Sequence, residues 1–469
     1  MIFVDGNKKN PLYEQIYNGL KKAIINEEMP RGSRLKPIRS LAKELNVSNN
    51  TISKAYQQLL EEGYIKSIQG SGYYVRKIIV NSKKRKIADD NIINQKSTEI
   101  IYDFDYDPID SRIFPWSKWR HYLMKAISDE EINNIIGYED KRGSIELRRE
   151  LCKYVYQSRG IKCDPEQLII CAGKQYALDI ILDILPEEYN KAGIEDPCLQ
   201  RVRKSFCDKK KIIQSIPVTE TGIDTGKLEK SDCNLLYTTP SHNFPLGYIT
   251  TLTKRVQIAE WAKRNNNYVI EDDFENEFFD GRQNIPAITS LDKSGQVIYM
   301  HTLSRILSPS IRCTYIIMPK KLMPLYEERY KYYYTAIPIH NQNALAAFIR
   351  DGHLERQSNK TQKYNQKKYM KMKSMFERLL PDEVIFNDVS SYSHILLEIP
   401  ACNNGEELRK YMLKSGIKCS DAHSFWIGKS SHTGAVLVLG FHGIEEEDLD
   451  EACEEFANVL KEYLAMQHN

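Results

Sequence analysis

Two short segments of this chain carry residue types that suit the binding of a small anion. Thr302-Leu303-Ser304-Arg305, with Arg312 downstream, combines hydroxyl and guanidinium groups. Gly173-Lys174-Gln175 stands at a turn into a predicted helix, where backbone N–H groups and the helix dipole attract negative charge. We therefore expect a phosphate or carboxylate ligand. Because a guanidinium stays protonated near neutral pH, Arg305 cannot attack an aldehyde as a lysine amine can.

The elements that would position these residues alternate between short apolar runs and helical runs. The candidates for buried strands are Leu168–Ile170, Leu235–Tyr237, Tyr268–Ile270, Val297–Met300 and Tyr315–Met318. Helical patterns such as Gln175–Leu185 and Thr253–Arg264 lie between them. This alternation predicts an α/β fold with a mixed, mainly parallel sheet and helices on both faces. Its ligands would bind at the carboxyl ends of the strands.

The pattern changes after about residue 320 to that of a smaller α+β part. The predicted elements there are the strands His394–Ile399 and Val436–Phe441 and the helix Glu446–Tyr463. We therefore divide the segment 101–469 into a large part, 101–320, and a small C-terminal part, 321–469.

The first 77 residues show a different pattern, that of three helices and a hairpin. Apolar residues at spacing four predict a helix over about Leu12–Asn26, and Ile38–Leu45 predicts a short second helix. Ser48 is placed to cap a third helix, which ends at Gly63. The third helix is expected to bury Ile52, Tyr56, Leu59 and Leu60, and a hairpin follows around Gly70-Ser71-Gly72. This arrangement predicts a winged helix-turn-helix.

The start of the third helix would lie in the major groove of DNA. Its outward residues are Ser48, Asn49, Asn50, Thr51 and Lys54. Asparagine can pair bidentately with adenine, and serine or threonine can hold a phosphate. Gly70 would let the wing backbone lie close to a phosphate. A winged helix that binds only proteins is the alternative.

Composition and charge narrow the class of protein. The chain has 469 residues and a net charge of +3, but residues 1–80 hold 13 Lys/Arg against 7 Asp/Glu, and Lys83-Lys84-Arg85-Lys86 follows. A basic head favours a polyanion partner, with solubility as the alternative. Ten scattered cysteines without a C-x-x-C spacing argue against zinc ribbons, so no metal site is expected. Without a long apolar run or a signal peptide, we expect a cytoplasmic protein that does not enter membranes.

The head resembles the GntR family of transcriptional regulators. The motifs that carry the resemblance are Pro11-Leu12-Tyr13, Leu35-Lys36-Pro37-Ile38-Arg39, Val47-Ser48-Asn49-Asn50-Thr51, Ala55-Tyr56, Glu62-Gly63 and Gly70-Ser71-Gly72. The resemblance implies DNA contacts at Arg39, Ser48, Asn50, Thr51 and Gly70. Asn49 departs from the family, whose members often have arginine there.

Segment 101–469 resembles fold-type I aminotransferases, as found in the MocR branch of the GntR regulators. The matching runs are Gly137-Tyr138, Lys141-Arg142-Gly143-Ser144, Ala172-Gly173-Lys174-Gln175, Thr239–Gly247, Ile270–Phe278 and Thr302-Leu303-Ser304-Arg305 with Arg312. The resemblance implies a homodimer and a site for pyridoxal 5′-phosphate (PLP). In that site Asp272 would pair with the ring nitrogen and Asn243 would lie near the ring hydroxyl. Gly173, Gln175, Thr302, Ser304 and Arg312 would hold the phosphate.

Four positions depart from the aminotransferase pattern. Arg305 stands at the position of the Schiff-base lysine, Phe274 replaces a tyrosine, and Leu199 replaces the ring-stacking aromatic residue. The strand Ala435–Phe441 lacks the arginine that usually binds the substrate carboxylate. We therefore predict no catalytic residue. Arg201 and Arg305 become candidate effector contacts, and Lys174 is expected to contact an anion rather than form a Schiff base.

These observations predict a GntR-type DNA-binding head at 1–77, a flexible charged linker at 78–100 and an aminotransferase-like effector and dimerisation body at 101–469. The predicted function is sequence-specific transcriptional regulation, with double-stranded DNA and a small anionic metabolite or vitamer as partners. The alternatives are a regulator that binds PLP non-covalently, an active aminotransferase joined to a DNA-binding head, and a purely structural scaffold. The operator, the effector and the direction of regulation are not predicted.

Overall fold

The structure is a computed structural model of the whole chain. It describes residues 11–26, 28–76, 100–106, 110, 112–128, 140–273, 275, 285–387, 392–402, 404–428 and 434–467. The chain divides into two compact units, residues 1–97 and 98–469, which contain the head and the body respectively. The predicted linker, 78–100, lies outside the described residues except for Ile100, and so do Phe274, Gly137 and Tyr138.

The head contains the three predicted helices and the predicted hairpin. They are α1 (Leu12–Ile25), α2 (Ile38–Glu44) and α3 (Asn49–Glu61), followed by β1 (Ile65–Ile68) and β2 (Gly72–Val75). The two strands are antiparallel, with Ile65 opposite Val75. Helices and hairpin share one apolar core, to which α1 contributes Ile16 and Leu20. The prediction of a winged helix-turn-helix is confirmed.

Helix α3 begins and packs for reasons that are visible in its sequence. The Ser48 hydroxyl accepts a hydrogen bond from the Thr51 backbone N–H at 3.1 Å, which satisfies one of the free donors of the first turn. The buried residues are Ile52, Ala55, Tyr56 and Leu59. The expectation that Leu60 is also buried is wrong, because Leu60 is 37% exposed. One residue after Leu59 lies about 100° further around the helix, away from the stripe facing the core.

The large part of the body is built on an eight-stranded sheet in the order β4-β11-β10-β9-β8-β5-β6-β7. The strands are β4 (Leu168–Ala172), β5 (Lys191–Asp196), β6 (Ile212–Thr219), β7 (Gly222–Ile223), β8 (Leu235–Thr238), β9 (Tyr268–Asp272), β10 (Val297–Thr302) and β11 (Cys313–Ile317). Strand β11 is antiparallel to both of its neighbours, and β7 is antiparallel to β6. The other pairs are parallel, which confirms the predicted mixed, mainly parallel sheet.

Helices cover both faces of this sheet, so that even its terminal strand β4 is buried on both sides. Leu168 and Ile170 of β4 pack into one core, and the alternate residues Ile169 and Cys171 pack into another. The helices of the large part and of its border are α4 (Trp116–Ala126), α6 (Ile145–Arg159), α7 (Lys174–Ile184), α8 (Gln200–Asp208), α9 (Thr225–Lys230), α10 (Leu252–Asn265), α11 (Ile288–Leu291), α12 (Met323–Arg329) and α13 (Ile339–Arg350). Helices α4, α6 and α13 pack on the first core, and α7, α8 and α12 pack on the second.

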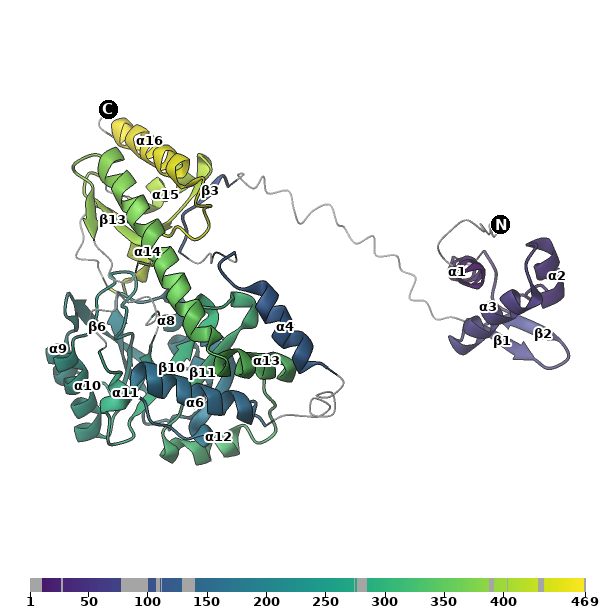
Figure 1. Ribbon diagram of the computed structural model, residues 1–469, viewed down its shortest axis with the longest axis horizontal. Helices are drawn as coiled ribbons and strands as arrows, with labels where there is room; N and C mark the ends of the chain where they lie inside the picture. The colour runs from purple at the N-terminus through teal and green to yellow at the C-terminus, as the bar shows by residue number, and fades with distance from the viewer. Residues whose placement is uncertain are drawn as a thin grey trace. The chain divides into compact units, whose positions relative to one another are not determined.

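The small part of the body is an antiparallel sheet covered by helices. Its strand order is β12-β13-β16-β15. The elements are β12 (Ile385–Asn387), β13 (Ile395–Ile399), α15 (Gly405–Lys414), β15 (Ser420–Asp421), β16 (Ala435–Leu439) and α16 (Leu449–Gln467), while β3 (Tyr102–Asp103) pairs with β14 (Ile417–Lys418). Figure 1 shows α14 (His353–Leu379) running from α13 in the large part to α16 in the small part. The predicted strands and C-terminal helix of this part are present within a few residues of the expected bounds.

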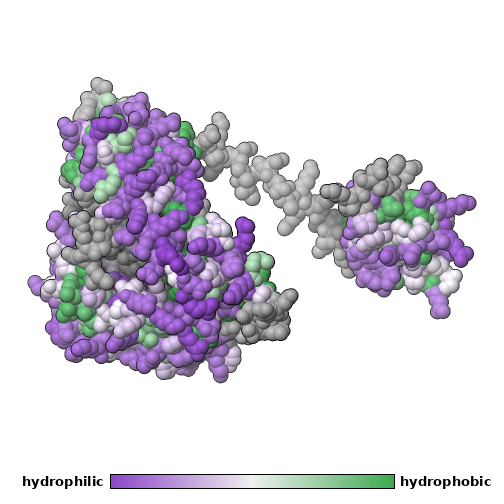
Figure 2. Space-filling model, viewed as in Figure 1, coloured by the Kyte–Doolittle hydropathy of each residue, from purple (hydrophilic) through white to green (hydrophobic). Residues whose placement is uncertain are grey.

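The surface of the body is mainly polar. Figure 2 shows a face covered by hydrophilic side chains with small hydrophobic patches between them. Among the described residues, no helix combines the length and apolar character that a membrane span requires. All ten cysteines are free thiols.

Candidate ligand site and DNA-binding surface

The sheet topology brings the candidate residues of the body to one edge. Ala172 lies opposite Cys313, Met300 lies opposite Asp272, and Thr302 lies opposite Thr314. The ends of β4, β9 and β10 therefore meet where β11 begins. This is the carboxyl edge of the parallel strands, where ligands bind in open α/β sheets.

Four of the candidate residues at this edge form the group that we call the anion cradle: Gly173, Thr302, Ser304 and Arg312. Gly173 is the N-cap of α7 and has φ 101°. A Cβ at this position would lie 2.4 Å from Arg312 Nη2, so only glycine lets the guanidinium reach the start of the helix. Thr302 Oγ1 donates to Ser304 Oγ at 3.3 Å. Gln175 lies in the first turn of α7 and is half-buried.

Arg312 keeps its positive charge available in the cradle. Its Nη2 donates to the Ala172 carbonyl at 3.3 Å, and its side chain is exposed. Among the described residues it makes no ion pair with a carboxylate. A guanidinium beside free helix N–H groups and two hydroxyls is a suitable receptor for a phosphate or carboxylate group.

Lys174 makes a buried ion pair with Asp272. Its Nζ lies 2.7 Å from Asp272 Oδ2, and the two side chains are 10% and 0% exposed. The Tyr237 hydroxyl donates to the same oxygen at 2.5 Å. Burial lowers the pKa of Lys174 from its ordinary value, and the negative charge of Asp272 opposes that change. The sequence interpretation placed each residue at the site but did not pair them.

Arg305 makes a second buried ion pair, with Glu275. Its Nε donates to Glu275 Oε1 at 2.8 Å, and its Nη2 lies 2.7 Å from the same oxygen. The guanidinium stacks on the Tyr106 ring, with Cζ 4.3 Å from the ring centroid, and the Tyr106 hydroxyl donates to Glu275. Burial alone would raise the pKa of Glu275, but Arg305 and His242 outweigh it, and the Tyr106 hydrogen bond adds to the lowering to about 2. Arg305 is thus held by a carboxylate of its own chain.

Buried histidines surround this second pair. His242 Nε2 lies 3.6 Å from Glu275 Oε2, and the His394 ring lies 5.6 Å from the His242 ring. Burial lowers the pKa of His242, and it lowers the pKa of His394 and of His442 to about 3. The nearby charge of Arg305 acts in the same direction. These rings are therefore neutral near pH 7.

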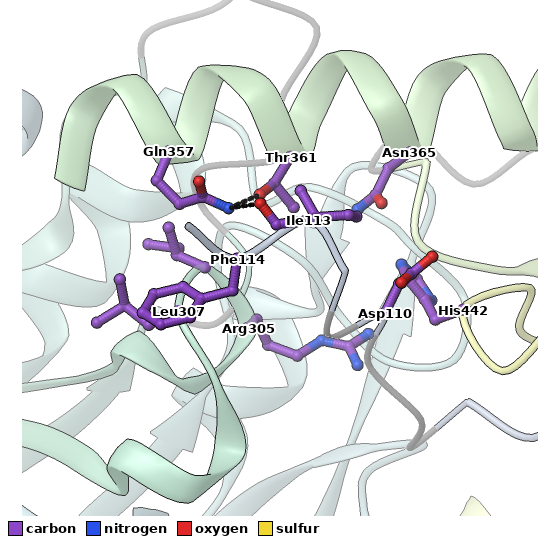
Figure 3. Close-up of a pocket in the computed structure, with 10 residues that line it drawn as sticks. Asp110, Ile113, Phe114, Arg305, Leu307, Gln357, Thr361, Asn365 and His442 are labelled. Atoms are coloured by element: carbon purple, nitrogen blue, oxygen red, sulfur yellow. Dashed lines mark hydrogen bonds between the residues drawn. The ribbon is translucent and has the colours of Figure 1, made fainter. Parts of the chain in front are cut away.

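Arg305 also borders a small cavity beneath α14, lined by both apolar and polar side chains. Figure 3 shows its guanidinium on the side of the cavity where Asp110 and His442 lie. Asn365 on α14 is 1% exposed, and neither polar atom of its amide has a hydrogen-bond partner among the described residues. The cavity has room for about one water molecule. It is too small for a metabolite in this conformation.

The side-chain amide of Asn243 is held by hydrogen bonds to neighbouring groups of the protein. Its Nδ2 donates to Glu195 Oε2 at 3.1 Å and to the Pro197 carbonyl at 3.3 Å. Glu195 also accepts hydrogen bonds from Thr238 and Thr239. The buried carboxylate thus ties the ends of β5 and β8 together.

A larger pocket lies beyond Tyr106. Its volume is about 330 Å³, and its lining includes Leu199, Arg201, Phe244 and Phe425. Leu199 therefore lines a pocket instead of stacking on a ring, and Arg201 is exposed at its edge. The aromatic and cationic lining suits a small carboxylate.

The residues present do not fit PLP as aminotransferases hold it. The carboxylate that would meet the ring nitrogen, Asp272, is already paired with Lys174. Arg305 is already paired with Glu275 and cannot form a Schiff base. Protein side chains thus engage the two groups that would meet the cofactor ring. The strand Ala435–Leu439 is fully buried and carries no arginine.

Several residues of the site had no role in the sequence interpretation: Tyr106, Glu195, Tyr237, Glu275, His394 and His442. Glu275 belongs to the acidic segment Glu271–Glu275. The sequence interpretation took this segment as a family motif and assigned no ion-pair partner to Glu275. The only signal that could have singled it out is the need of Arg305 for a counter-charge. The other residues stand in ordinary apolar or turn sequences.

On the head, the predicted DNA contacts are distributed over α2, the start of α3 and the hairpin turn, and most of them are exposed. Asn49, Asn50 and Lys54 are exposed at the start of α3, and Ser48 precedes them. Thr51 is half-buried, and its hydroxyl lies 2.8 Å from that of Ser48. Arg39 on α2 and Gly70 in the hairpin turn are exposed as well. The helix-turn-helix with an accessible polar first turn, joined to an α/β body with an anion cradle, is the architecture of a DNA-binding regulator.

Comparisons with known proteins agree with this class. The family "Bacterial regulatory proteins, gntR family" matches residues 12–75, and "Aminotransferase class I and II" matches residues 117–456. The chain is 34% identical over 454 residues to the uncharacterized HTH-type transcriptional regulator YdeL of Bacillus subtilis, over 96% of this chain and 97% of that protein. It is 26% identical to the probable rhizopine catabolism regulatory protein MocR of Rhizobium meliloti, over 96% of this chain and 94% of that protein.

The solved structures show the fold of the body. The kynurenine aminotransferase of Pyrococcus horikoshii matches with a TM-score of 0.70 and 21% identity, over 78% of this chain and 92% of that chain. The chain belongs to the GntR-type transcriptional regulators of the MocR type, which join a helix-turn-helix head to an aminotransferase class I and II domain.

Proposed function

We propose that this DNA-binding regulator senses a small anionic metabolite in its aminotransferase-like body. The observation that carries the proposal is Arg312, whose guanidinium lies at the N-terminus of α7 without a carboxylate partner among the described residues. An exposed guanidinium beside helix N–H groups is open to an anion from solvent and can bind it by charge-assisted hydrogen bonds. The anion cradle supplies the other groups that such a ligand needs.

Charge pairing decides which cations remain for the ligand. Four were predicted to contact it: Lys174, Arg201, Arg305 and Arg312. Two of them, Lys174 and Arg305, already neutralise Asp272 and Glu275. The proposal therefore assigns the ligand to Arg312, while Arg201, at the pocket of about 330 Å³, remains a separate candidate contact.

We further propose a homodimer that reads two half-sites on double-stranded DNA. Helix-turn-helix readers commonly bind as dimers. The body has an aromatic run on its surface, Tyr332-Tyr333-Tyr334, with each side chain at least 56% exposed. Tyrosine is enriched at protein interfaces. Light scattering at several concentrations measures the state of assembly directly, and a monomer throughout would refute this part.

The test is the affinity of the full chain for DNA with and without ligand. Duplexes covering the chain's own genomic neighbourhood are titrated by fluorescence anisotropy. Inorganic phosphate, phosphorylated metabolites, carboxylic acids, amino acids, PLP and pyridoxamine phosphate are added in turn. We expect at least one anion to change the affinity for DNA and to raise the melting temperature of the body. Arg312→Ala should abolish both effects, while Arg329→Ala, at an exposed arginine of α12, should not.

Each alternative gives a distinct result. Failure to bind any duplex would refute DNA regulation by this head. DNA binding that no anion alters, with no thermal shift, would identify a structural scaffold. A Schiff-base chromophore with PLP, together with conversion of amino acids, would identify an active aminotransferase.

A further inference from the structure

We propose that Lys174 takes the place of a cofactor ring inside the body, so that the site recognises its ligand through the anion cradle and excludes PLP. The proposal rests on the proposed function, because it specifies the chemical class of the ligand. It follows from where the Lys174 side chain begins and where it ends.

The Lys174 side chain crosses the space that the ring would need. Lys174 is the first residue of α7 and directly follows Gly173, which belongs to the anion cradle. Its ammonium reaches Asp272 at the end of β9, 2.7 Å from Oδ2. The four-carbon stem thus links the cradle to the carboxylate. A molecule held by its phosphate in the cradle and by a ring nitrogen at Asp272 would have to occupy the same path.

Displacing Lys174 is unfavourable because both partners are buried. Asp272 is 0% exposed and accepts from the ammonium and from Tyr237 on one oxygen. If the ammonium moved away, the buried carboxylate would remain charged without a cation until a ligand supplied one. Removing one partner of a buried ion pair is strongly destabilising. The pair therefore opposes any ligand that needs Asp272 for itself.

The Arg305–Glu275 pair likewise engages a charged group beside the space that a cofactor ring would need. Arg305 is fixed by two contacts with Glu275 and by stacking on Tyr106. Glu275 is 0% exposed, so its carboxylate depends on that guanidinium. Both cations near the ring side thus have their own carboxylates. The remaining ligand class is a phosphorylated or carboxylated small molecule without a cationic aromatic ring.

The experiment compares PLP with inorganic phosphate in the full chain. Isothermal titration calorimetry gives both dissociation constants for the wild type and for Lys174→Ser, which removes the stem and releases Asp272. We expect Lys174→Ser to bind PLP about 100-fold more tightly than the wild type does. Phosphate affinity should change by less than about threefold, because the cradle keeps Arg312.

A matched control separates the pocket from a general loss of charge. Lys204 makes an ion pair with Asp208 on the surface of α8, with side chains 72% and 56% exposed. Lys204→Ser removes a Lys–Asp pair of the same type outside the site and should leave PLP affinity at the wild-type value. Wild-type protein that binds PLP as tightly as Lys174→Ser would overturn the proposal.

A second variant covers the case in which Lys174→Ser does not fold. Lys174→Ser with Asp272→Asn removes both charges, so no unpaired ion is left in the interior. It should also bind PLP more tightly than the wild type, because the path is open. Unchanged PLP affinity in this folded double variant would refute the proposal.

The proposed function fails separately. It is lost if phosphate and every other anion bind neither the wild type nor Lys174→Ser. Phosphate binding that Arg312→Ala abolishes supports it whatever the result with PLP.

Discussion

Single residues at the start of α3 are predicted to set the strength and the selectivity of DNA binding by the head. Asn49, Asn50 and Lys54 are exposed there, but only Lys54 is charged. Asn49 stands where GntR regulators often have arginine. A charged side chain at this position could add a phosphate contact, which strengthens binding at low salt and makes it more sensitive to salt.

We predict that Asn49→Arg increases the affinity for DNA and steepens the dependence of log Kd on log salt by about 1. Lys54→Ala should reduce the affinity and lower that slope by about 1. Fluorescence anisotropy from low to moderate salt measures both. Lys22→Ala on α1 is the control for a change of net charge alone. Equal slopes for all variants would show that neither side chain lies at the DNA backbone.

The residues of the body show the limit of sequence reasoning at this scale. Lys174 and Asp272 were both identified from their motifs, since each motif lies on a short continuous segment. Their ion pair joins the start of α7 to the end of β9, and it depends on the strand order of the sheet. Glu275 was not identified as the partner of Arg305, because a carboxylate in an acidic run has many possible partners.

At the scale of secondary structure, the turn from β4 into α7 fixes the anion cradle. Gly173 has φ 101° and ψ 165°, a region that is essentially restricted to glycine. The absent side chain also makes room for the Arg312 guanidinium. The turn therefore determines both where α7 begins and where the cation lies.

Gly173→Ala should lower the free energy of unfolding of the body by about 1–3 kcal/mol and also abolish anion binding. Gly160→Ala is a matched control, because Gly160 has φ 68° but no atom within 4 Å of an added Cβ. It should cost about 1–2 kcal/mol and leave anion affinity unchanged. Urea unfolding followed by tryptophan fluorescence reports on the body alone, since Trp116, Trp119, Trp261 and Trp426 all lie in it. Retained anion affinity in Gly173→Ala would contradict the cradle.

The strands that the sequence predicted are those with continuous apolar runs. Strands β8, β9, β10 and β11 lie inside the sheet, and β4 lies at its edge but is still covered on both faces. Strand β5 (Lys191–Asp196) was missed because its short sequence contains a glycine and three charged residues, Lys191, Glu195 and Asp196. Strand β6 was missed because it lies near the sheet edge, is largely half-exposed and contains Pro217. Continuous apolar runs thus identified strands, and the prediction failed where glycine, proline or charged residues interrupt the run.

For the whole molecule, the buried histidines couple the stability of the body to pH. His394 and His442 have pKa values of about 3 in the folded body, chiefly because of burial. An unfolded chain protonates histidine at about pH 6.5. Between these values the unfolded state binds more protons, so stability is complete above about pH 6.5 and decreases as the pH falls.

We predict that the free energy of unfolding of the body falls by up to about 1.4 kcal/mol per pH unit for each of these histidines as the pH falls below 6.5. Urea unfolding at several pH values, followed by tryptophan fluorescence, measures the slope. His442→Gln should flatten the slope, and His121→Gln, at an exposed position of α4, should not. A slope that is identical in all three proteins would show that His442 does not titrate differently on unfolding.

Both members of the Lys174–Asp272 pair are supplied by the polypeptide itself. On the proposal made for this pair, the buried charge of Asp272 is neutralised by Lys174 as soon as the chain folds. No vitamin-derived molecule has to bind first. During a shortage of vitamin B6, enzymes that require PLP would lose activity, whereas this regulator would still fold without the cofactor. The cell would then keep this control of transcription when its amino-acid metabolism is impaired.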